Sequence, residues 1–538
     1  MVSAAARKIF ASARGGVGDL TRGPRLVILA LCILGGGLLS VAMGTDRNWD
    51  LRNYHVYGPY AWLHGRIFLD LAPAQVQSFF NPTLYIPHQA LFFALQGAPR
   101  VFAFLMGLPA GLFAFLMLRI AWDHAAQIQG PGPVAWAAAV IAGAMGLTGA
   151  AVLPGVGLSS FDVLVAVPVA LAYWIVLRET IRRDTGQQPR LRPLMIAGAT
   201  AGLAVGLKLT ALPFVAAIGL MILVLLGLRA AIAAGLAVAA GFLLGFGPFA
   251  WHLWQATGNP IFPIYNNLFR SPEWLPQHFA DERFLPRSWL QGIFYPFWWL
   301  TTNSNLVTEL QMRDPRMALG YLAWVVLAVL LVGQRRFAGA RGLWLALGVS
   351  ALSYAVWARM FGIYRYIVFL EALAAVLVML ALIFALRQRP VLGLLGFAAL
   401  TAVAIPVTVH PNWGHGRHGT RILDVEAMPV RPGDLVVSVD DAPMAYLVPL
   451  MPPDIRAIGL ASNFVRPGHD HGMMRRIRAA IAEHGDGAIW SVGEGSTPPA
   501  TRDRVLAAYN LELDGACIML RSSFEPAGHQ FCPVRKRS

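Results

Sequence analysis

The sequence predicts a polytopic α-helical membrane protein that ends in a small α/β domain. Of its 538 residues, 57% are hydrophobic and only 13% are charged, whereas about 25% of the residues of an ordinary soluble domain are charged. Mean hydropathy is +0.56. Long apolar segments alternate with short loops that carry arginine, which is typical of membrane helices oriented by cytoplasmic positive charge. A soluble fold of this length is disfavoured, because its surface would need far more charged side chains.

The net charge of +15 does not indicate a nucleic-acid partner. Much of the Lys and Arg excess lies in short loops between apolar segments, as the positive-inside rule requires. No basic face with interleaved aromatic residues is present in the sequence. The lipid bilayer is therefore the first partner that the composition predicts, and nucleic acid is not expected.

The predicted spans begin with residues 26–43, which follow a basic N-terminal stretch. No clear small-x-small cleavage site precedes Asp46, so we expect an uncleaved signal-anchor with its N-terminus in the cytoplasm. Further apolar segments bring the expected number of spans to about eleven, each near the length that a bilayer requires. These segments are 98–121, 132–153, 160–177, 193–207, 209–228, 230–254, 317–334, 341–359, 363–386 and 391–409.

Loop charge supports this topology. Five short loops would face the cytoplasm, and four of them contain arginine: 178–192, the turn at Arg229, 335–341 and 387–390. An odd number of spans then places the C-terminus outside the cytoplasm.

Two long outer loops and a C-terminal domain complete the predicted organisation. The loops cover about 45–97 and 257–316, and the second contains the aromatic cluster YPFWW, which we expect at headgroup level. We expect a membrane module over 1–409 and an α/β domain over 410–538, since the latter alternates short β-like runs with helical patterns. A disulfide between Cys517 and Cys532 is expected if this domain lies outside the cytoplasm.

The first outer loop carries the strongest candidates for chemistry. Asp46 and Asp50 lie just beyond the first span, and Asn53, Tyr54 and His55 follow them. A carboxylate at the membrane boundary can act as a general base, orient an acceptor or bind a divalent cation. The structural alternative is that polar residues simply follow a membrane helix. Farther along the loop, Gln75 and Asn81 could bind a sugar or only form a polar surface.

Three basic residues near the outer ends of predicted spans are candidates for binding phosphate. Lys208 lies in GLKLT, and Arg359 and Arg365 flank the turn in WARMFGIYRYIVFLEAL. Cations converging from separate helices would form a phosphate clamp. Snorkelling, a headgroup contact or an ion pair is the alternative for each. Asp162 begins another span on the same side and is expected to pair with Lys208 or Arg365.

Several catalytic motifs are missing from the sequence. It contains no Walker A sequence, no GxSxG and no HExxH. The histidine-rich HPNWGHGRH, residues 410–418, matches no standard metal spacing, so we interpret it as a connector. No metal site is predicted.

The stretches WDLRNYHVYGPYAWLHGR, DLAPAQVQSFFNP and GLKLT, together with the topology, resemble the GT-C superfamily of membrane glycosyltransferases. The resemblance implies transfer of a sugar from a polyprenyl-phosphate donor to a lipid, glycan or protein acceptor outside a bacterial inner membrane. It implies that Asp50 or Asp46 acts as the base and that Lys208, Arg359 and Arg365 hold the donor phosphate. The loop has DRNWD in place of Asp-x-Asp, which leaves a divalent cation open but favours no cofactor.

Two other function classes fit part of the pattern. A transporter or flippase of a lipid-linked or anionic substrate would use the same cations, but no internal repeat is detected. A non-catalytic envelope assembly protein would act through its C-terminal domain, and its loop carboxylates would be dispensable.

Overall fold

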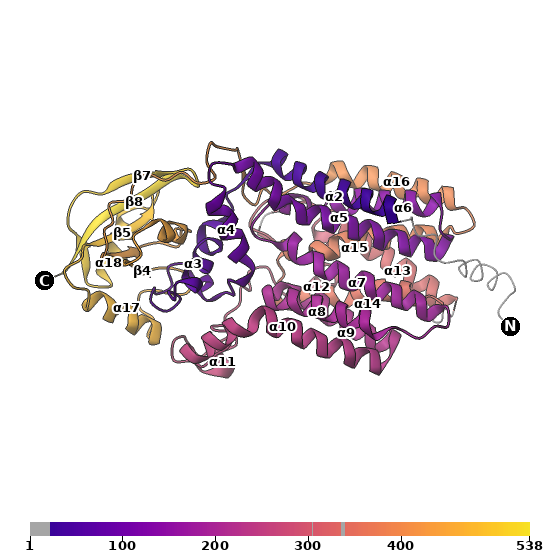
Figure 1. Ribbon diagram of the computed structural model, residues 1–538, viewed down its shortest axis with the longest axis horizontal. Coiled ribbons are helices and arrows are strands. Elements are labelled where there is room, and N and C mark those ends of the chain that lie inside the picture. The colour runs from indigo at the N-terminus through magenta and orange to yellow at the C-terminus, as the bar shows by residue number, and fades with distance from the viewer. Residues whose placement is uncertain (1–21, 304, 335–338, 538) are drawn as a thin grey trace.

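The computed structural model describes residues 22–303, 305–334 and 339–537. The basic N-terminal stretch and the proposed cytoplasmic N-terminus lie outside these residues. The described chain forms a bundle of long helices with a sheet domain at one end, and the first outer loop lies between them (Figure 1). We call the end of the bundle next to the sheet domain the domain side.

Each apolar segment of the sequence forms a helix in the described chain. The bundle consists of α2 (Arg22–Met43), α5 (Pro99–Gln129), α6 (Pro133–Leu147), α7 (Asp162–Asp184), α8 (Leu191–Leu207), α9 (Leu212–Leu226), α10 (Leu228–Thr257), α13 (Arg316–Gly333), α14 (Arg341–Met360), α15 (Val368–Ala385) and α16 (Pro390–Val407). Within the described residues, nine candidate spans are long and apolar enough to cross a membrane, and two helices, α6 and α8, are shorter. The prediction of a polytopic helical membrane protein is confirmed.

The largest difference from the predicted spans is at the end of α5. The apolar pattern ends at about residue 121, yet the helix continues to Gln129. The added turns are polar but buried: Asp123 accepts a hydrogen bond from the indole of Trp174, and His124 pairs with the hydroxyl of Tyr173. Contacts with α7 therefore extend the helix beyond its apolar pattern.

The C-terminal domain is built on a mixed sheet. Its strands are β3 (Leu435–Ser438), β4 (Arg456–Gly459), β5 (Ile489–Glu494), β6 (Leu511–Leu513), β7 (Ile518–Ser522) and β8 (Glu525–Lys536), in the order β4-β3-β5-β8-β6, and β7 also pairs with β8. The strands β4, β3 and β5 are parallel, and β8 is antiparallel to β5. The helices are α17 (Gly472–Ala482) and α18 (Pro499–Ala507). Cys517 and Cys532 form the expected disulfide.

The first outer loop is joined to this sheet. It contains a π-helical turn at Leu51–His55, α3 (Tyr57–Leu63) and α4 (Ile86–Ala94). Leu71 forms a parallel bridge with Ile458 of β4. A buried ion pair between Arg66 and Asp70 lies at the same junction, where Asp70 accepts the backbone N–H of Ala457 at 2.9 Å. The loop and the C-terminal domain thus share one packed interface.

The histidine-rich connector, residues 410–418, packs against the membrane module through backbone pairing and histidine hydrogen bonds. Its short strand β2 (His415–Gly416) pairs with β1 (Thr45–Asp46) directly after the first span. His410, His415 and His418 contact the carbonyl oxygens of Thr148, Pro154 and Val41. In the part of the chain that the structure describes, no group of three or more His, Cys, Asp or Glu side chains is placed to hold a metal ion.

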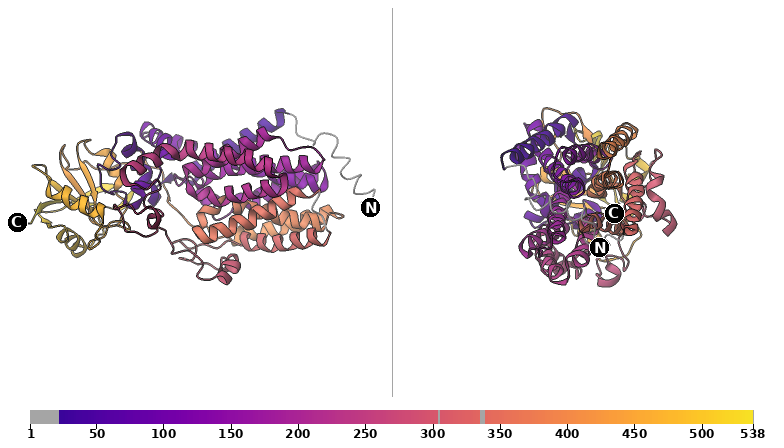
Figure 2. Two further views of the ribbon diagram at one scale, coloured as in Figure 1. Left: turned by 90° about the horizontal axis from the view of Figure 1, so that it is seen from below. Right: turned by 90° about the vertical axis from the view of Figure 1, so that its right-hand side faces the viewer.

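The second outer loop contains two short helices, α11 (Asn266–Phe269) and α12 (Trp289–Trp298). In the left view of Figure 2 this loop leaves the bundle along its lower edge on the domain side.

Candidate functional site

Asp46, the first candidate base, is a structural carboxylate in this fold. Its side chain accepts three hydrogen bonds, from the backbone and side chain of Asn48 at 2.9 and 2.8 Å and from the backbone of Ser159 at 2.6 Å. Burial raises the pKa of the Asp46 carboxyl despite these hydrogen bonds. The side chain fastens the end of the first span to the segment that precedes α7.

That segment, residues 148–161, is non-helical for most of its length and is held by buried carboxylates. Glu371 accepts the backbone N–H groups of Ala151 at 2.9 Å and Val152 at 3.0 Å, and Asp314 accepts that of Ala150 at 2.8 Å. Buried backbone N–H groups need such partners, because an unpaired one is strongly unfavourable. The carboxylates therefore fix the path of the chain into α7.

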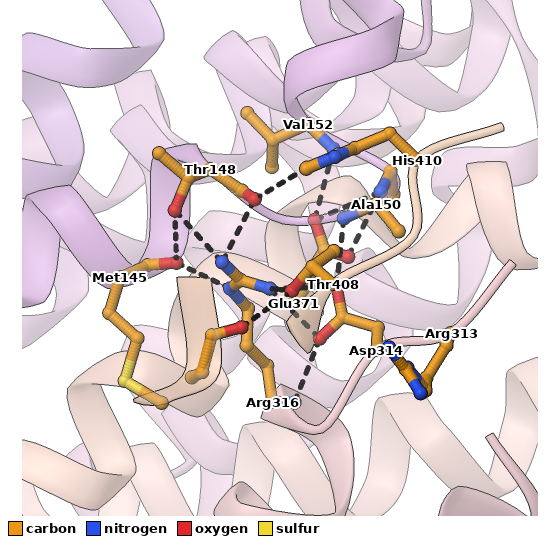
Figure 3. A network of polar contacts seen from close by, with 12 residues as sticks. Met145, Thr148, Ala150, Val152, Arg313, Asp314, Arg316, Glu371, Thr408 and His410 are labelled. Atoms are coloured by element: carbon orange, nitrogen blue, oxygen red, sulfur yellow. Dashed lines mark hydrogen bonds and ion pairs between the residues drawn. The ribbon is translucent and has the colours of Figure 1, made fainter. Parts of the chain in front are cut away.

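Asp314 and Glu371 belong to a network with Arg316, which we call the buried network (Figure 3). Both side chains of the Asp314–Arg316 ion pair are 0% exposed, and their closest approach is 3.0 Å. The guanidinium of Arg316 also donates to the carbonyl oxygens of Met145 and Thr148. The donors and acceptors of this network are matched within the protein.

A second group of charges lies where four separate elements meet on the domain side. Asp50 precedes the π-helical turn, Asp162 begins α7, Lys208 follows α8, and Arg365 lies in the 3₁₀ turn Tyr364–Ile367. We call these four residues the charge cluster. They alternate in sign along a chain of ion pairs, so the cluster is neutral overall.

The distances within the charge cluster show how the cations converge. Arg365 Nη1 lies 2.7 Å from Asp50 Oδ2, and Arg365 Nε lies 3.9 Å from Asp162 Oδ2. Lys208 Nζ lies 2.5 Å from Asp162 Oδ1 and donates to the carbonyl oxygen of Ser160 at 2.6 Å. Asp162 thus holds the two cations near each other. The predicted pairing of Asp162 with Lys208 or Arg365 is confirmed for both.

Asp50 differs from Asp46 in its hydrogen bonding. Among the described residues, Asp50 Oδ2 has the ion pair with Arg365 but accepts no hydrogen bond, and its side chain does not cap the turn that follows. Its side chain is 10% exposed. A carboxylate in this state retains lone pairs for another donor.

Aromatic rings and a neutral histidine lie beside the cluster. His55 stacks on Tyr85 with centroids 4.1 Å apart, and Tyr54 packs edge-on against both rings. Burial, with smaller contributions from nearby His88 and from Lys208 and Arg365, lowers the pKa of His55 well below its usual value. His55 Nδ1 lies 2.9 Å from the hydroxyl of Ser159, and no described residue hydrogen-bonds Nε2.

The other candidate residues lie outside the cluster or serve the fold. Asn81 donates to the carbonyl oxygens of Gly206 and Gly245, which ties the first loop to α8 and α10. Gln75 donates to the carbonyl oxygen of Asp441 in the C-terminal domain, and Asn53 to that of Ala74. Arg359 is exposed at the end of α14, and within the described residues no ion pair connects it to the cluster.

A small cavity of about 10 Å³ adjoins the charge cluster. It is bounded by Asp162 of α7, Thr210 after α8, and Tyr366 beside Arg365, and otherwise by apolar side chains of α7, α9 and α15. One end of the cavity is therefore charged and the rest is apolar.

Sequence reasoning did not identify the buried network or the role of the 148–161 segment. Glu371 lies within the predicted span 363–386, and its partners come from residues far away in the sequence. The stretch RDPRMALG could have indicated the ion pair, because Asp314 and Arg316 flank a proline directly at the start of α13.

Comparisons with known proteins give a general likeness in fold. No family model matches the chain, and no curated protein matches its sequence. Among solved structures, the chain is similar to ArnT from Cupriavidus metallidurans in the apo state, with 14% identity, a TM-score of 0.48, and 96% of this chain and 98% of that chain covered. It is also similar to the same protein bound to undecaprenyl phosphate, with 12% identity, a TM-score of 0.46, and 95% and 98% covered. At this level of similarity, function has to be inferred from the side chains of this chain.

Proposed function

We propose that the protein is a membrane glycosyltransferase that moves a sugar from a polyprenyl-phosphate donor to an acceptor on the outer side of the membrane. The observation that carries the proposal is the charge cluster. It brings a carboxylate, Asp50, whose Oδ2 accepts no hydrogen bond from the described residues, together with two cations, Lys208 and Arg365, that converge on Asp162. A transferase of this kind needs a base for the acceptor and positive charge for the departing phosphate.

In the proposed reaction, an acceptor hydroxyl donates a hydrogen bond to Asp50. The acceptor oxygen bonds to the anomeric carbon while the bond from that carbon to the donor phosphate oxygen breaks. The proton of the hydroxyl passes to Asp50, and the bonding electron pair leaves with the polyprenyl phosphate. Lys208 and Arg365 stabilise the negative charge on the leaving phosphate. These steps use only side chains of this chain.

The small cavity beside the cluster, of about 10 Å³, has the polarity of a lipid-linked donor but would have to widen to admit one. Its charged end adjoins Asp162, and its apolar walls come from helices of the bundle. A donor with a phosphate at one end and an isoprenoid chain at the other has the same polarity. We propose that the phosphate of the donor lies between Lys208 and Arg365.

We assign the role of base to Asp50 and not to Asp46. Asp46 already accepts three hydrogen bonds that hold the backbone of the 148–161 segment. An incoming hydroxyl would have to displace one of them. Asp50 holds no backbone segment in this way: its Oδ2 pairs with Arg365 at 2.7 Å and accepts no hydrogen bond from the described residues.

We further propose that the domain side faces the periplasm of a bacterium. The Cys517–Cys532 disulfide supports this orientation, because disulfides persist in oxidising compartments. The arginine-rich loops between the predicted spans support it as well. The acceptor, whether lipid, glycan or protein, would then approach from the periplasmic side.

Sugar transfer in membranes that contain the wild type, Asp50→Asn or Asp46→Asn tests the proposal, with radiolabelled polyprenyl-phosphate sugars as donors. We expect Asp50→Asn to remain folded by gel filtration and to lose transfer by about 10²–10⁴-fold, the usual contribution of a general base. We expect Asp46→Asn to lower the melting temperature, since it disturbs a buried set of hydrogen bonds.

Two outcomes would contradict the proposal. Full activity of Asp50→Asn would remove the base assignment. A lack of transfer by the wild type across a broad set of donors would favour the transporter or the assembly protein. Uptake of a labelled lipid-linked substrate into vesicles would then distinguish these two alternatives.

A further inference from the structure

A second cavity lies in the second outer loop, apart from the charge cluster. Its volume is about 560 Å³, within the range of small-ligand sites. Residues 283–288 form one wall, α12 forms another, and Asn305 with Leu306 completes it. No residue of the proposed transferase site lines this cavity, so the two sites are separate.

The polar part of the cavity lining is positively charged. Arg283 and Arg287 line the cavity, and no carboxylate does. Arg283 is neutralised by Asp281 at 2.7 Å and by Glu309 at 3.1 Å. The guanidinium of Arg287 is exposed and has no ion-pair partner among the described residues. The guanidinium of Arg287 is therefore available to pair with a negatively charged group of a ligand.

The rest of the cavity is apolar and opens onto an apolar surface. Phe294 and Trp298 of α12 line it and remain about half exposed. The neighbouring Trp289, Leu290 and Ile293 are also exposed. Such a continuous apolar surface on a short helix is unfavourable in water but favourable at the boundary of a bilayer.

The contacts of α12 place this surface at membrane level. The hydroxyl of Tyr354 on α14 donates to the carbonyl oxygen of Gly292 at 2.6 Å. Tyr354 lies in a candidate span, six residues before that span ends at Met360. The exposed side of α12 therefore lies beside the domain-side end of the bundle, where the headgroups of the adjacent leaflet would be.

We propose that this cavity binds the phosphodiester headgroup of an anionic glycerophospholipid from that leaflet. Arg287 pairs with the single negative charge of the phosphate, since arginine forms strong charge-assisted hydrogen bonds to phosphate. The acyl chains lie along Phe294 and Trp298. The bound lipid is a site-specific partner of the protein, separate from the polyprenyl-phosphate donor, and the proposal does not depend on sugar transfer.

Lipid binding is also expected to stabilise the part of the second outer loop that contacts Tyr364, the residue before Arg365. The backbone N–H of Tyr364 donates to the carbonyl oxygen of Val307, and the hydroxyl of Tyr295 donates to that of Leu306 at 2.6 Å. A lipid held against Tyr295 and Leu306 therefore supports the segment that precedes Arg365. The second outer loop is expected to be more stable with the lipid than without it.

The test uses the full-length protein in detergent with phosphatidylglycerol, phosphatidylethanolamine or inorganic phosphate added. We expect native mass spectrometry to retain one phosphatidylglycerol molecule per chain and thermal unfolding to shift upward with this lipid. Arg287→Gln should weaken retention about tenfold, as the loss of one charge-assisted hydrogen bond predicts. Arg270→Gln removes a charge from an exposed position of the same loop away from the cavity and should bind like the wild type.

Each other outcome would overturn the proposal. Equal retention of phosphatidylglycerol and phosphatidylethanolamine would mean that the protein does not select the anionic headgroup. Inorganic phosphate producing the same thermal shift would identify a site for free phosphate and not for lipid. Unchanged retention by a folded Arg287→Gln protein, or an equal loss in Arg270→Gln, would remove the assignment of the cavity.

Discussion

The buried network and the charge cluster place similar residues on the same side of the molecule but arrange them differently. In the buried network, the side chains of the Asp314–Arg316 ion pair are 0% exposed. The carboxylates of the network accept hydrogen bonds from backbone N–H groups of the 148–161 segment. The charge cluster is partly open, with Arg365 at 23% exposed, and Asp50 Oδ2 accepts no hydrogen bond in the described chain.

The difference separates structural charges from charges that are available to a ligand. A buried charge is stable only when all its hydrogen-bonding capacity is used, and the buried network meets this condition. The charge cluster keeps unused acceptors next to a cavity, which is typical of functional sites. Substitutions in the network should therefore affect stability first, and substitutions in the cluster should affect activity first.

The largest expected effect is on stability. Arg316→Met leaves Asp314 and Glu371 buried without their cation and should lower the free energy of unfolding by about 3–5 kcal/mol. Thermal unfolding in detergent measures the change. Arg535→Met is the matched control, because Arg535 forms an exposed ion pair with Glu512 and should change stability little. Equal melting temperatures for both variants would mean that the network is not a structural unit.

The next effect is on activity. Lys208→Gln removes one cation of the cluster and should reduce transfer by about 10- to 100-fold, the size of one charge-assisted hydrogen bond to phosphate. The melting temperature should fall less than in Arg316→Met, since Lys208 is 12% exposed and Asp162 keeps a contact with Arg365 at 3.9 Å. Arg359→Gln, which removes a cation outside the cluster, should retain activity. A loss of transfer in Arg359→Gln as large as in Lys208→Gln would mean that the cations of the charge cluster have no special role in transfer.

The smallest effect is a pH dependence in the C-terminal domain. Burial lowers the pKa of His529 to about 4, and its Nε2 lies 2.6 Å from the hydroxyl of Tyr446. Nearby Glu525 raises this pKa and Arg52 lowers it, both less than burial does. The pKa of His529 is lower in the folded protein than in the unfolded chain, so protons bind the unfolded chain more strongly between these two pKa values. The free energy of unfolding therefore does not depend on His529 protonation above about pH 6.5, and it decreases as the pH falls from 6.5 toward 4.

At pH 5, protonation of His529 in the unfolded chain should lower the free energy of unfolding by about 1–2 kcal/mol. Melting temperatures of the wild type and His529→Gln between pH 7.5 and pH 5 measure it. The variant should show a shallower decline than the wild type. Parallel curves would mean that His529 does not contribute to the pH dependence of folding.

The sequence was sufficient to predict the parts of the fold that depend on local patterns. The apolar segment 317–334 corresponds to α13 at Arg316–Gly333, and 341–359 to α14 at Arg341–Met360. Bilayer length and loop arginines determine such segments, so no knowledge of distant contacts is needed. The α/β character of the C-terminal region was predicted from its short β-like runs for the same reason.

The site was only partly predictable, because its geometry comes from contacts between distant residues. Asp50, Lys208 and Arg365 were identified as candidates one by one, and the structure brings them together through Asp162. Arg359 has the same chemistry and a similar place in the sequence, yet it remains outside. Asp46 differs from Asp50 in the two hydrogen bonds that it accepts from the nearby Asn48 and in the backbone N–H of the distant Ser159, which reaches only Asp46.

The way the 148–161 segment is held has a consequence for biogenesis. Its backbone is fastened by Asp46 from the beginning of the chain, and by Asp314 and Glu371 from much later parts. During synthesis the N-terminal helices emerge first, but the segment gains its partner Asp314 only at the start of α13 and its partner Glu371 only with α15. Asp162 is therefore placed late. A ribosome stalled before α15 should carry a nascent chain with most of its helices in the membrane and no assembled charge cluster.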